Sequence, residues 1–325
     1  MSLNIQERMP RVTSSSRGRQ KRTGWTRYRG RTFYAFLSPW LFGFFGLMLL
    51  PLVYALVISF TNFAGVGHWH WLGLGNYSEA LRDPDVLYSL GRTLLYTLLI
   101  VPLGVAGGLG LAVLVNGQMP AVGVFRALFY LPAIVPITAG ALIWKVLFDR
   151  NTGAVNAIVE AFHLPPVTWL SDPYAFLVMV TLVLWGIGGG MVISLAGLQG
   201  IPAELHEAAA VDGSPAVQTF FRITLPLLSP VLFFQVITGV IGALQTLVQP
   251  LLLTTANGAV AASSVPHGNE LYMVNVYAQF VVNQRLGYGS ALLWILFAIV
   301  LAITLLVFRS SAFWVYYEIE QEKGE

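Results

Sequence analysis

The polar side chains best suited to holding a solute lie within long apolar stretches of the chain. Trp185, Thr238, Gln245, Thr246 and Gln249 offer an aromatic face, hydroxyls and amides, and none of them is charged. A carboxamide both donates and accepts hydrogen bonds, which suits a neutral solute rich in hydroxyl groups. Gln245 and Gln249 are four residues apart and would share one face of a helix. The alternative is that these groups bond neighbouring helices to each other.

The chain lacks the motifs of common catalytic sites. The pattern G-x-x-x-x-G-K-[ST] does not occur, because Lys21, Lys145 and Lys323 follow Gln, Trp and Glu, so a P-loop cannot hold ATP here. H-E-x-x-H and G-x-S-x-G are absent, and no histidine stands near Ser194 or Ser290. We therefore expect a chain that is not an enzyme and that binds no cofactor of its own.

Ion coupling and metal binding have little support either. His68 and His70 form a His-x-His pair, but no further ligand stands at a supporting spacing, and Trp69 and Trp71 fit an interfacial segment better. The apolar stretches contain no Asp or Glu, whereas proton- and sodium-coupled carriers usually keep an acidic side chain at mid-membrane depth. This pattern disfavours transport driven by an ion gradient without excluding it, and no metal site is predicted.

A polar segment, 204–226, separates two of the apolar stretches and is typical of two short helices joined at a glycine. Pro202 fits the first position of the first helix, and Gly213 can adopt the left-handed conformation that ends it. Ser214 is a candidate N-cap for the second helix, with Pro215 at its first position. A plain surface loop needs no such punctuation. We expect this segment to hold a fixed shape and to present it to a partner.

The composition places these segments in a membrane. The chain has 325 residues, of which 56% are hydrophobic and 10% charged, and its mean hydropathy is +0.70. Ordinary soluble domains are about 25% charged, and a helix needs ~20 apolar residues to cross a bilayer. There is no cysteine, so disulfides and thiolate chemistry are absent. We predict an all-α polytopic membrane protein with six transmembrane helices, at 33–60, 93–115, 126–148, 174–198, 227–254 and 288–308, and a short helix at 271–280.

Glycines cluster in two of the predicted spans. Gly104 and Gly108 form a small-xxx-small face, which permits close packing of helices. A second cluster of glycines is typical of a hinge, of a close helix crossing, or of backbone that faces a cavity. Its members follow Trp185 and are Gly186, Gly188, Gly189 and Gly190.

Positive charge is concentrated before the first span. Nine of the 18 Lys and Arg residues lie within residues 1–32, a polar stretch that we expect to be disordered. Such a tail can contact nucleic acid or anionic lipid, but a signal for membrane orientation explains it more simply, and we expect no nucleic-acid partner. Six spans with the N-terminus inside place 13 basic residues inside and 5 outside. Because cytoplasmic segments are rich in Lys and Arg, both termini and segment 204–226 are expected to be cytoplasmic.

Segment 204–226 also carries a fixed pattern, E-A-A-x3-G-x9-I-x-L-P, without a gap. The matching residues are Glu207, Ala208, Ala209, Gly213, Ile223, Leu225 and Pro226. This pattern resembles the EAA loop of permease subunits of bacterial binding-protein-dependent ABC importers. Shorter pieces resemble the sugar-permease branch, such as permeases for maltose, lactose or glycerol-3-phosphate, and these are Ser38-Pro39, Gly75-Asn76-Tyr77 and Tyr130-Leu131-Pro132. The resemblance covers about residues 33–308.

The resemblance implies the fold of type I ABC importer permeases and a set of partners. The chain would be a passive permease subunit of the bacterial inner membrane, surrounded by lipid, that translocates a sugar or oligosaccharide inward by alternating access. Its partners would be a second permease subunit in a heterodimer, two subunits that bind and hydrolyse ATP, and an extracytoplasmic solute-binding protein. Residues 33–308 would form the permease domain with a coupling loop at 200–226, between a basic tail at 1–32 and an acidic tail at 309–325.

The resemblance also implies roles for single residues. The coupling loop would dock in a cleft of an ATP-binding subunit through Glu207, Ala208, Ala209, Asp212, Gly213, Ile223, Leu225 and Pro226. In the maltose-type branch the sugar lies among the spans that flank this loop, which implies a substrate site at Trp185, Gly186, Thr238, Gln245 and Gln249. The family often has Gly-Gly-Pro after the fifth span, whereas this chain has Thr255-Ala256-Asn257-Gly258, so its contact with the binding protein is expected to differ.

Three alternatives remain open at the level of the sequence. In the first, segment 204–226 is only a stable connector and docks on no partner. In the second, the solute is a glycerol phosphate or a polyol and not a sugar. In the third, the chain is a membrane scaffold or channel without an ATPase partner. A phosphate ester requires a cation near its site, and the spans that flank the loop contain none, which favours a neutral sugar.

Overall fold

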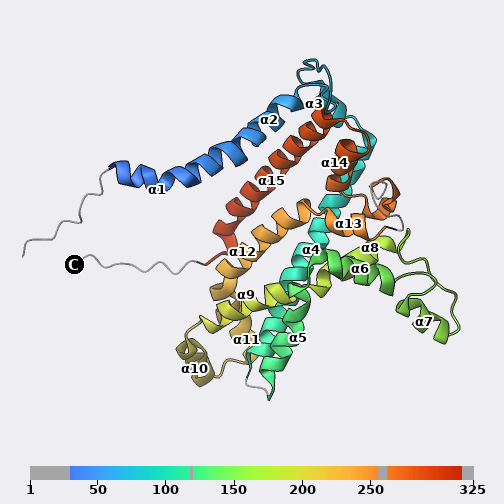
Figure 1. Cartoon of the computed structure of the whole chain (residues 1–325). Helices are drawn as coiled ribbons and strands as arrows, with labels where there is room; N and C mark the ends of the chain where they lie inside the picture. The colour runs from blue at the N-terminus through green and yellow to red at the C-terminus, as the bar shows by residue number, and fades with distance from the viewer. Residues whose placement is uncertain (1–29, 118–119, 255–261, 317–325) are drawn as a thin grey trace, which may run out of the picture. The chain divides into compact units, whose positions relative to one another are not determined.

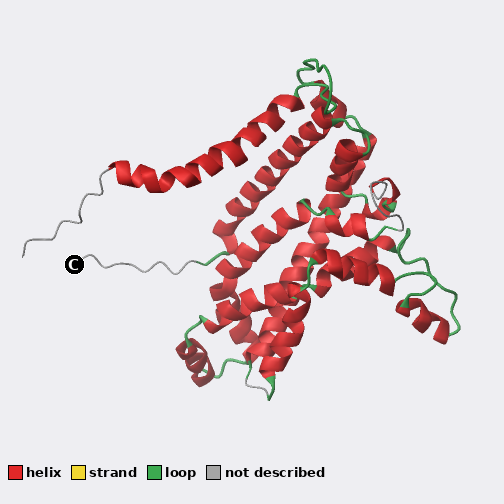
Figure 2. Cartoon of the chain, in the orientation of Figure 1, coloured by secondary structure: helices red, strands yellow, loops and turns green. Residues whose placement is uncertain are grey.

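The computed structural model describes residues 30–117, 120–254 and 262–316, and these residues are helical almost throughout (Figures 1 and 2). The chain divides into two compact units, 1–53 and 54–325. Most of the predicted basic tail, the end of the acidic tail and residues 255–258 lie outside the described residues. The described part of the tail, residues 30–32, already belongs to a helix, so the first helix begins three residues earlier than predicted.

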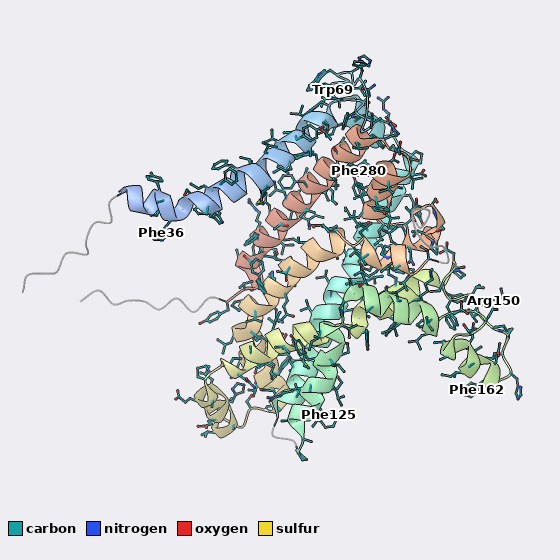
Figure 3. The ribbon with its side chains drawn as sticks, viewed as in Figure 1. Phe36, Trp69, Phe125, Arg150, Phe162 and Phe280 are labelled. Carbon is teal, nitrogen blue, oxygen red and sulfur yellow. The ribbon has the colours of Figure 1, made fainter. Side chains whose placement is uncertain are left out.

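The first unit is an apolar helix with an irregular turn. It comprises α1 (Gly30–Gly43), the π-helical η1 (Phe44–Leu49) and the beginning of α2 (Leu50–Ser59). The N–H of Leu50 donates to the carbonyl of Phe45, five residues back, immediately before Pro51, whose nitrogen carries no hydrogen to continue the ladder. Over its described residues none of the apolar stretch is buried within the chain, and the side chain of Phe36 projects from α1 (Figure 3). Such a surface requires lipid or another protein around it.

The second unit contains the remaining long helices. The described part of the chain has five helices that are long and apolar enough to cross a membrane. One comprises residues 33–59, and the other four lie in the second unit. A bent pair of helices is a sixth crossing if the pair counts as one span. The four are α4 (Pro84–Asn116), α8 with α9 (Ala175–Trp185 and Gly188–Gln199), α11 with η2 and α12 (Ala216–Thr219, Phe220–Thr224 and Leu225–Leu244) and α15 (Leu286–Trp314). The predicted all-α membrane class is thereby confirmed.

The third predicted span is not one straight helix. It divides into α5 (Val122–Ile134) and α6 (Ile137–Leu147), whose axes differ by 94°. Pro136 precedes α6, and Val135 before it is extended, with φ −64° and ψ 127°. A residue before proline is pushed out of the helical region, and proline itself donates no hydrogen bond. The span predicted at 126–148 is therefore a bent pair of helices and not one straight helix.

The fifth predicted span ends earlier than expected. The helix α12 stops at Leu244, and a separate short helix, α13 (Val248–Leu252), follows. Pro250 cannot donate to the carbonyl of Thr246, four residues back, and its ring would clash with that group, which favours a break in the helix before it. Gln245 and Gln249 consequently do not lie on one continuous helix, which corrects the expectation that they share a face.

Short helices cover the two ends of the second unit. The α10 end carries α10 (Ala203–Val211) and α11, and the opposite end, named here the α3 end, carries α3 (Gly75–Ala80) and α14 (Tyr272–Val281) (Figure 1). The helix α7 (Ala154–Ala161) and the 3-10 turn η4 (His267–Asn269) complete the set. The short helix predicted at 271–280 is confirmed as α14.

The α3 end is fastened by polar side chains. The Asn76 amide donates to the carbonyls of Ser59 and Thr61, each at 2.8 Å. Arg285 at the start of α15 forms an ion pair with Glu79 of α3 at 2.7 Å. Among the described residues no group of three or more His, Cys, Asp or Glu side chains is placed to hold a metal, and His68 and His70 are both exposed there.

The helix α4 is the centre of the second unit, and α8, α9, α12 and α14 all pack against it. Where α4 and α9 cross, a Cβ placed on Gly108 would lie 3.0 Å from the carbonyl carbon of Gly190. Where α9 meets α5, a Cβ on Gly188 would collide with the carbonyl oxygen of Phe129. Close helix crossing, one of the three predictions for the glycine cluster, is therefore confirmed at Gly188 and Gly190, and Gly108 supplies the matching surface on α4.

Candidate functional site

The helix α10 presents most of the predicted coupling residues at the surface of the second unit. Glu207, Ala208, Asp212 and Gly213 are exposed, and Ala209 is the one buried residue of the helix. The remaining members of the pattern are half-buried, and these are Ile223, Leu225 and Pro226. The small side chain of Ala208 leaves the helix backbone accessible on its outer side, and Glu207 places a carboxylate beside it. The outer face of α10 therefore combines a small side chain with a negative charge.

The turn after α10 has a defined geometry. Gly213 adopts φ +71°, as predicted for the residue that ends this helix. The N–H of Gly213 donates to the carbonyl of Ala210 at 3.1 Å, and the N–H of Ser214 donates to that of Ala209 at 2.9 Å. These two bonds are the Schellman arrangement, which satisfies carbonyls that the helix end would otherwise leave free. The exit direction of the chain from α10 is therefore fixed by backbone hydrogen bonds.

The second helix of the segment begins one residue later than predicted. Pro215, in an extended conformation with ψ 150°, occupies the N-cap position, and no side chain of the described residues caps the helix. The Ser214 hydroxyl instead accepts a hydrogen bond from Thr219 Oγ1 at 3.2 Å. The prediction of Ser214 as N-cap was wrong, because Pro215 is extended and the first helical residue is Ala216. The next turn, η2, is π-helical.

A cavity of about 650 Å³ lies behind α10. Its walls come from α10, from η2 and from the ends of α4 and α9, and they include Asn116, Leu198, Phe220 and Phe221. His206 Nε2 and Thr224 Oγ1 are 3.1 Å apart at this cavity, with the donor set by the tautomer of the imidazole ring. This contact joins α10 to the residue immediately before α12 beside the cavity.

A second cavity, of about 330 Å³, lies between α4, α9 and α12 and includes the break between α8 and α9. Of the five residues predicted to bind solute, Gly186 and Thr238 line it. Gly104 and Gly190 contribute backbone to the same wall, so the glycine cluster serves both a helix crossing and a cavity. None of the described residues that line this cavity is charged.

The other three predicted solute residues lie elsewhere. The ring of Trp185 packs against that of Trp144 with centroids 4.8 Å apart, and it is half-buried against the apolar core. Gln245 lines a separate cavity of about 190 Å³ with Met273 and Phe297. Gln249 stands on α13 and lines neither cavity. The structure therefore does not bring the five predicted residues together.

Gln235 is a cavity residue that the sequence did not single out. Its side-chain nitrogen donates to Ser194 Oγ at 2.8 Å, which links α12 to α9. Its amide oxygen would lie 3.0 Å from a Cβ on Gly190 and accepts no hydrogen bond from the described residues. Gln235 precedes Thr238 by three residues and so shares its helix face. From this spacing within the fifth predicted span, Gln235 could have been predicted to face the same cavity as Thr238.

Comparison with known proteins decides the class of this molecule. A family model described as "Binding-protein-dependent transport system inner membrane component" matches residues 104–322. The chain belongs to this family. The permease is therefore a multi-pass inner-membrane transport subunit and not an enzyme, as predicted.

Three relatives of the permease each match at least three quarters of its length. It is 34% identical to the probable ABC transporter permease protein YesP of Bacillus subtilis over 89% of this chain and 93% of that protein. It is 32% identical to the sulfoquinovosyl glycerol transport system permease protein SmoG of Agrobacterium fabrum, over 79% of this chain and 82% of that protein. The trehalose/maltose transport system permease protein MalF of Thermococcus litoralis is also 32% identical, over 75% of this chain and 80% of that protein.

A solved structure confirms the predicted fold. The permease superposes on a chain of a bacterial alginate ABC transporter, solved in complex with an alginate pentasaccharide-bound periplasmic protein, with a TM-score of 0.76. The two chains are 20% identical, and the match covers 87% of the permease and 94% of that chain. The permease therefore has the fold of an ABC importer permease.

Proposed function

We propose that the permease moves a sugar or an oligosaccharide inward by alternating access, driven by ATP hydrolysis on separate subunits. The observation that carries the proposal is α10, an exposed helix with the E-A-A pattern whose exit is fixed at Gly213. An exposed helix held at a defined angle suits docking in the cleft of an ATP-binding subunit. The rest of the assembly would be a second permease subunit and an extracytoplasmic solute-binding protein.

The orientation follows from the basic residues. The α10 end would be cytoplasmic, because the N-terminal 32 residues carry half of all Lys and Arg and cytoplasmic segments are the basic ones. The α3 end, with its ion pair between Glu79 and Arg285, would then face the solute-binding protein. Residues 1–32 and 309–325 would both be cytoplasmic tails flanking the permease domain 33–308.

A carbohydrate is favoured by the second cavity and by the relatives. Relatives of the permease are described as transporting sulfoquinovosyl glycerol and trehalose/maltose. The cavity between α4, α9 and α12 offers an amide oxygen from Gln235, a hydroxyl from Thr238 and glycine backbone, without a charge among its described lining residues. Neutral acceptors in an apolar wall suit sugar hydroxyls, whereas a phosphate ester would require a cation there. Gln235, Gly186 and Thr238 are thus the proposed solute contacts.

Docking on α10 is tested by purification of the tagged permease from its native membranes. A subunit with ATP-hydrolysing activity should co-purify, and Glu207→Lys should reduce its recovery by about tenfold, the effect of losing 1.4 kcal/mol of binding free energy. Glu160→Lys changes an exposed glutamate of α7 in the same way and should retain the subunit. Absence of any ATPase from the wild-type preparation would contradict the proposal and favour a scaffold or channel.

The solute cavity is tested by uptake of radiolabelled lactose, maltose, trehalose and arabino-oligosaccharides into whole cells. Gln235→Leu should raise the KM of the transported sugar by roughly 5- to 30-fold, because a hydrogen bond to a neutral group contributes about 1–2 kcal/mol when its loss leaves a polar group unpaired. Ser194→Ala removes the partner of Gln235 but leaves its amide oxygen in place, so its effect should be smaller. Equal effects of the two variants would show that Gln235 acts only as a bridge between helices.

A further inference from the structure

The docking helix is attached to the rest of the permease by very little. Of the nine residues of α10, only Ala209 is buried. Among the described residues, a single side-chain hydrogen bond ties α10 to another element, the one between His206 and Thr224 at 3.1 Å. The Schellman turn at Gly213 fixes the backbone where α10 ends. The His206–Thr224 bond is a second link, through side chains, from the middle of α10 to the residue immediately before α12.

This bond ends at the root of the span that lines the proposed solute cavity. Thr224 is 6% exposed and is the last residue of the π-helical η2, immediately before α12. A π-helical turn is a frequent place for a functional irregularity in a long helix. Gln235 follows Thr224 by eleven residues, which is about 16 Å along the axis at 1.5 Å per residue. Motion applied at Thr224 is carried by α12 to Gln235 and Thr238.

Packing does not replace the bond if it is lost. The cavity of about 650 Å³ lies beside both His206 and Thr224, so α10 is not pressed against η2 by interlocking side chains. A weakly packed contact transmits force poorly, since the elements can slide before they meet. A hydrogen bond across the gap fixes the separation of two atoms directly.

We propose that His206 and Thr224 are positioning residues that make α10 and α12 move as one body when the ATP-binding subunits change state. The proposal rests on the docking role of α10. Neither residue contacts solute or ATP. Both side chains can donate and accept, so the bond forms with either neutral tautomer of the imidazole.

The absence of cysteine makes the test direct. Val211 of α10 and Phe234 of α12 are 88% and 56% exposed, and a cysteine at each accepts a spin label. Pulsed electron paramagnetic resonance then gives the distribution of distances between the labels in the complex purified with its ATP-binding subunits. Measurements are made without nucleotide and with ADP and vanadate.

A narrow distribution that is the same in both states is expected for the labelled parent. Thr224→Val keeps the shape of the side chain and removes the hydroxyl, and it should at least double the width of the distribution and make its mean depend on nucleotide. Thr224→Ser should restore the parent result. His206→Ala should repeat the effect of Thr224→Val without changing a buried residue. Thr97→Val, at a buried threonine whose hydroxyl donates to the carbonyl of Thr93 in its own helix, is the matched control and should change nothing.

The outcomes separate two failures. If no ATP-binding subunit accompanies the parent, the docking role and this proposal both fail. If the subunit is present and Thr224→Val gives the parent distribution in both states, docking stands and the His206–Thr224 link is overturned. A bond that merely stabilised the fold would lower the yield of the variants but would not make the distance respond to nucleotide.

Discussion

Gly213→Val should lower sugar uptake by about 5- to 30-fold while the permease still inserts into the membrane. Gly213 has φ +71°, a conformation that costs an L-residue about 1–2 kcal/mol and a β-branched residue more. A free-energy change of this size alters the population of the native turn by a factor of about 5–30. The affected population is the one in which α10 leaves the membrane domain at the correct angle. Uptake of labelled sugar, normalised to the amount of permease in purified membranes, measures the effect.

The loss of uptake expected for Gly213→Val comes from the backbone conformation and not from the size of the side chain, so a second substitution at Gly213 can serve as a control. Among the described residues no atom lies within 4 Å of the position that a Cβ would take, so a larger side chain meets no obstacle from them. Asparagine tolerates the left-handed region better than other non-glycine residues. Gly213→Asn should therefore retain most of the uptake that Gly213→Val loses. Equal loss in both variants would show that the side chain blocks a partner, and normal uptake in both would sink the coupling role of this turn.

The local fold of segment 204–226 was predictable because its determinants are local. Gly213 ends α10 with a positive φ, and Pro202 and Pro215 mark the helix starts to within one residue. Each of these effects acts over one or two turns of chain, and the sequence displays all of them together. The Ser214 cap failed for the same local reason, since its extended neighbour Pro215 displaced the start of the helix.

The solute residues were not predictable in the same way. Gln245 and Gln249 were expected on one helix face, but α12 ends at Leu244 and Gln249 belongs to the separate helix α13, so the two amides do not share a face. Trp185 was expected in the cavity, but its ring packs on Trp144 of another helix. Which side chains face one cavity depends on how separate helices cross, and apolar spans carry little periodicity to reveal it. Gly186 and Thr238 do line the cavity, while Gln235 was overlooked although it shares a face with Thr238.

The glycines show how the same residues determine the crossing and the cavity. Gly190 lets α9 approach α4 at Gly108, and its missing side chain also leaves room beside the amide of Gln235. A Cβ on Gly190 would lie 3.0 Å from the amide oxygen of Gln235 but 3.9 Å from the Cα of Gly108, so a side chain there would crowd the cavity, whereas one on Gly108 would push the two helices apart. The sequence indicated that small residues are required there without showing which neighbour requires each of them.

Gly188→Ala should destabilise the permease, whereas Gly189→Ala should not. A Cβ on Gly188 would collide with the carbonyl oxygen of Phe129 and lie 3.0 Å from the Cα of Tyr130, and both are backbone atoms of α5. The backbone of a packed helix cannot turn aside as a flexible side chain can, so α5 and α9 must move apart. Overpacking of this kind costs typically about 1–3 kcal/mol.

The neighbouring Gly189 is the matched control for this loss of stability. A Cβ on Gly189 would lie 3.8 Å from that of Ala133, an ordinary contact. Both substitutions gain about 1 kcal/mol of helix propensity, so any difference between them reflects packing alone. Thermal unfolding in detergent, followed by size-exclusion chromatography, should give a lower midpoint for Gly188→Ala and an unchanged or higher one for Gly189→Ala. Equal midpoints would mean that α5 and α9 do not cross as closely as Phe129 and Gly188 require, and the bend between α5 and α6 would then lose the contact that holds it against α9.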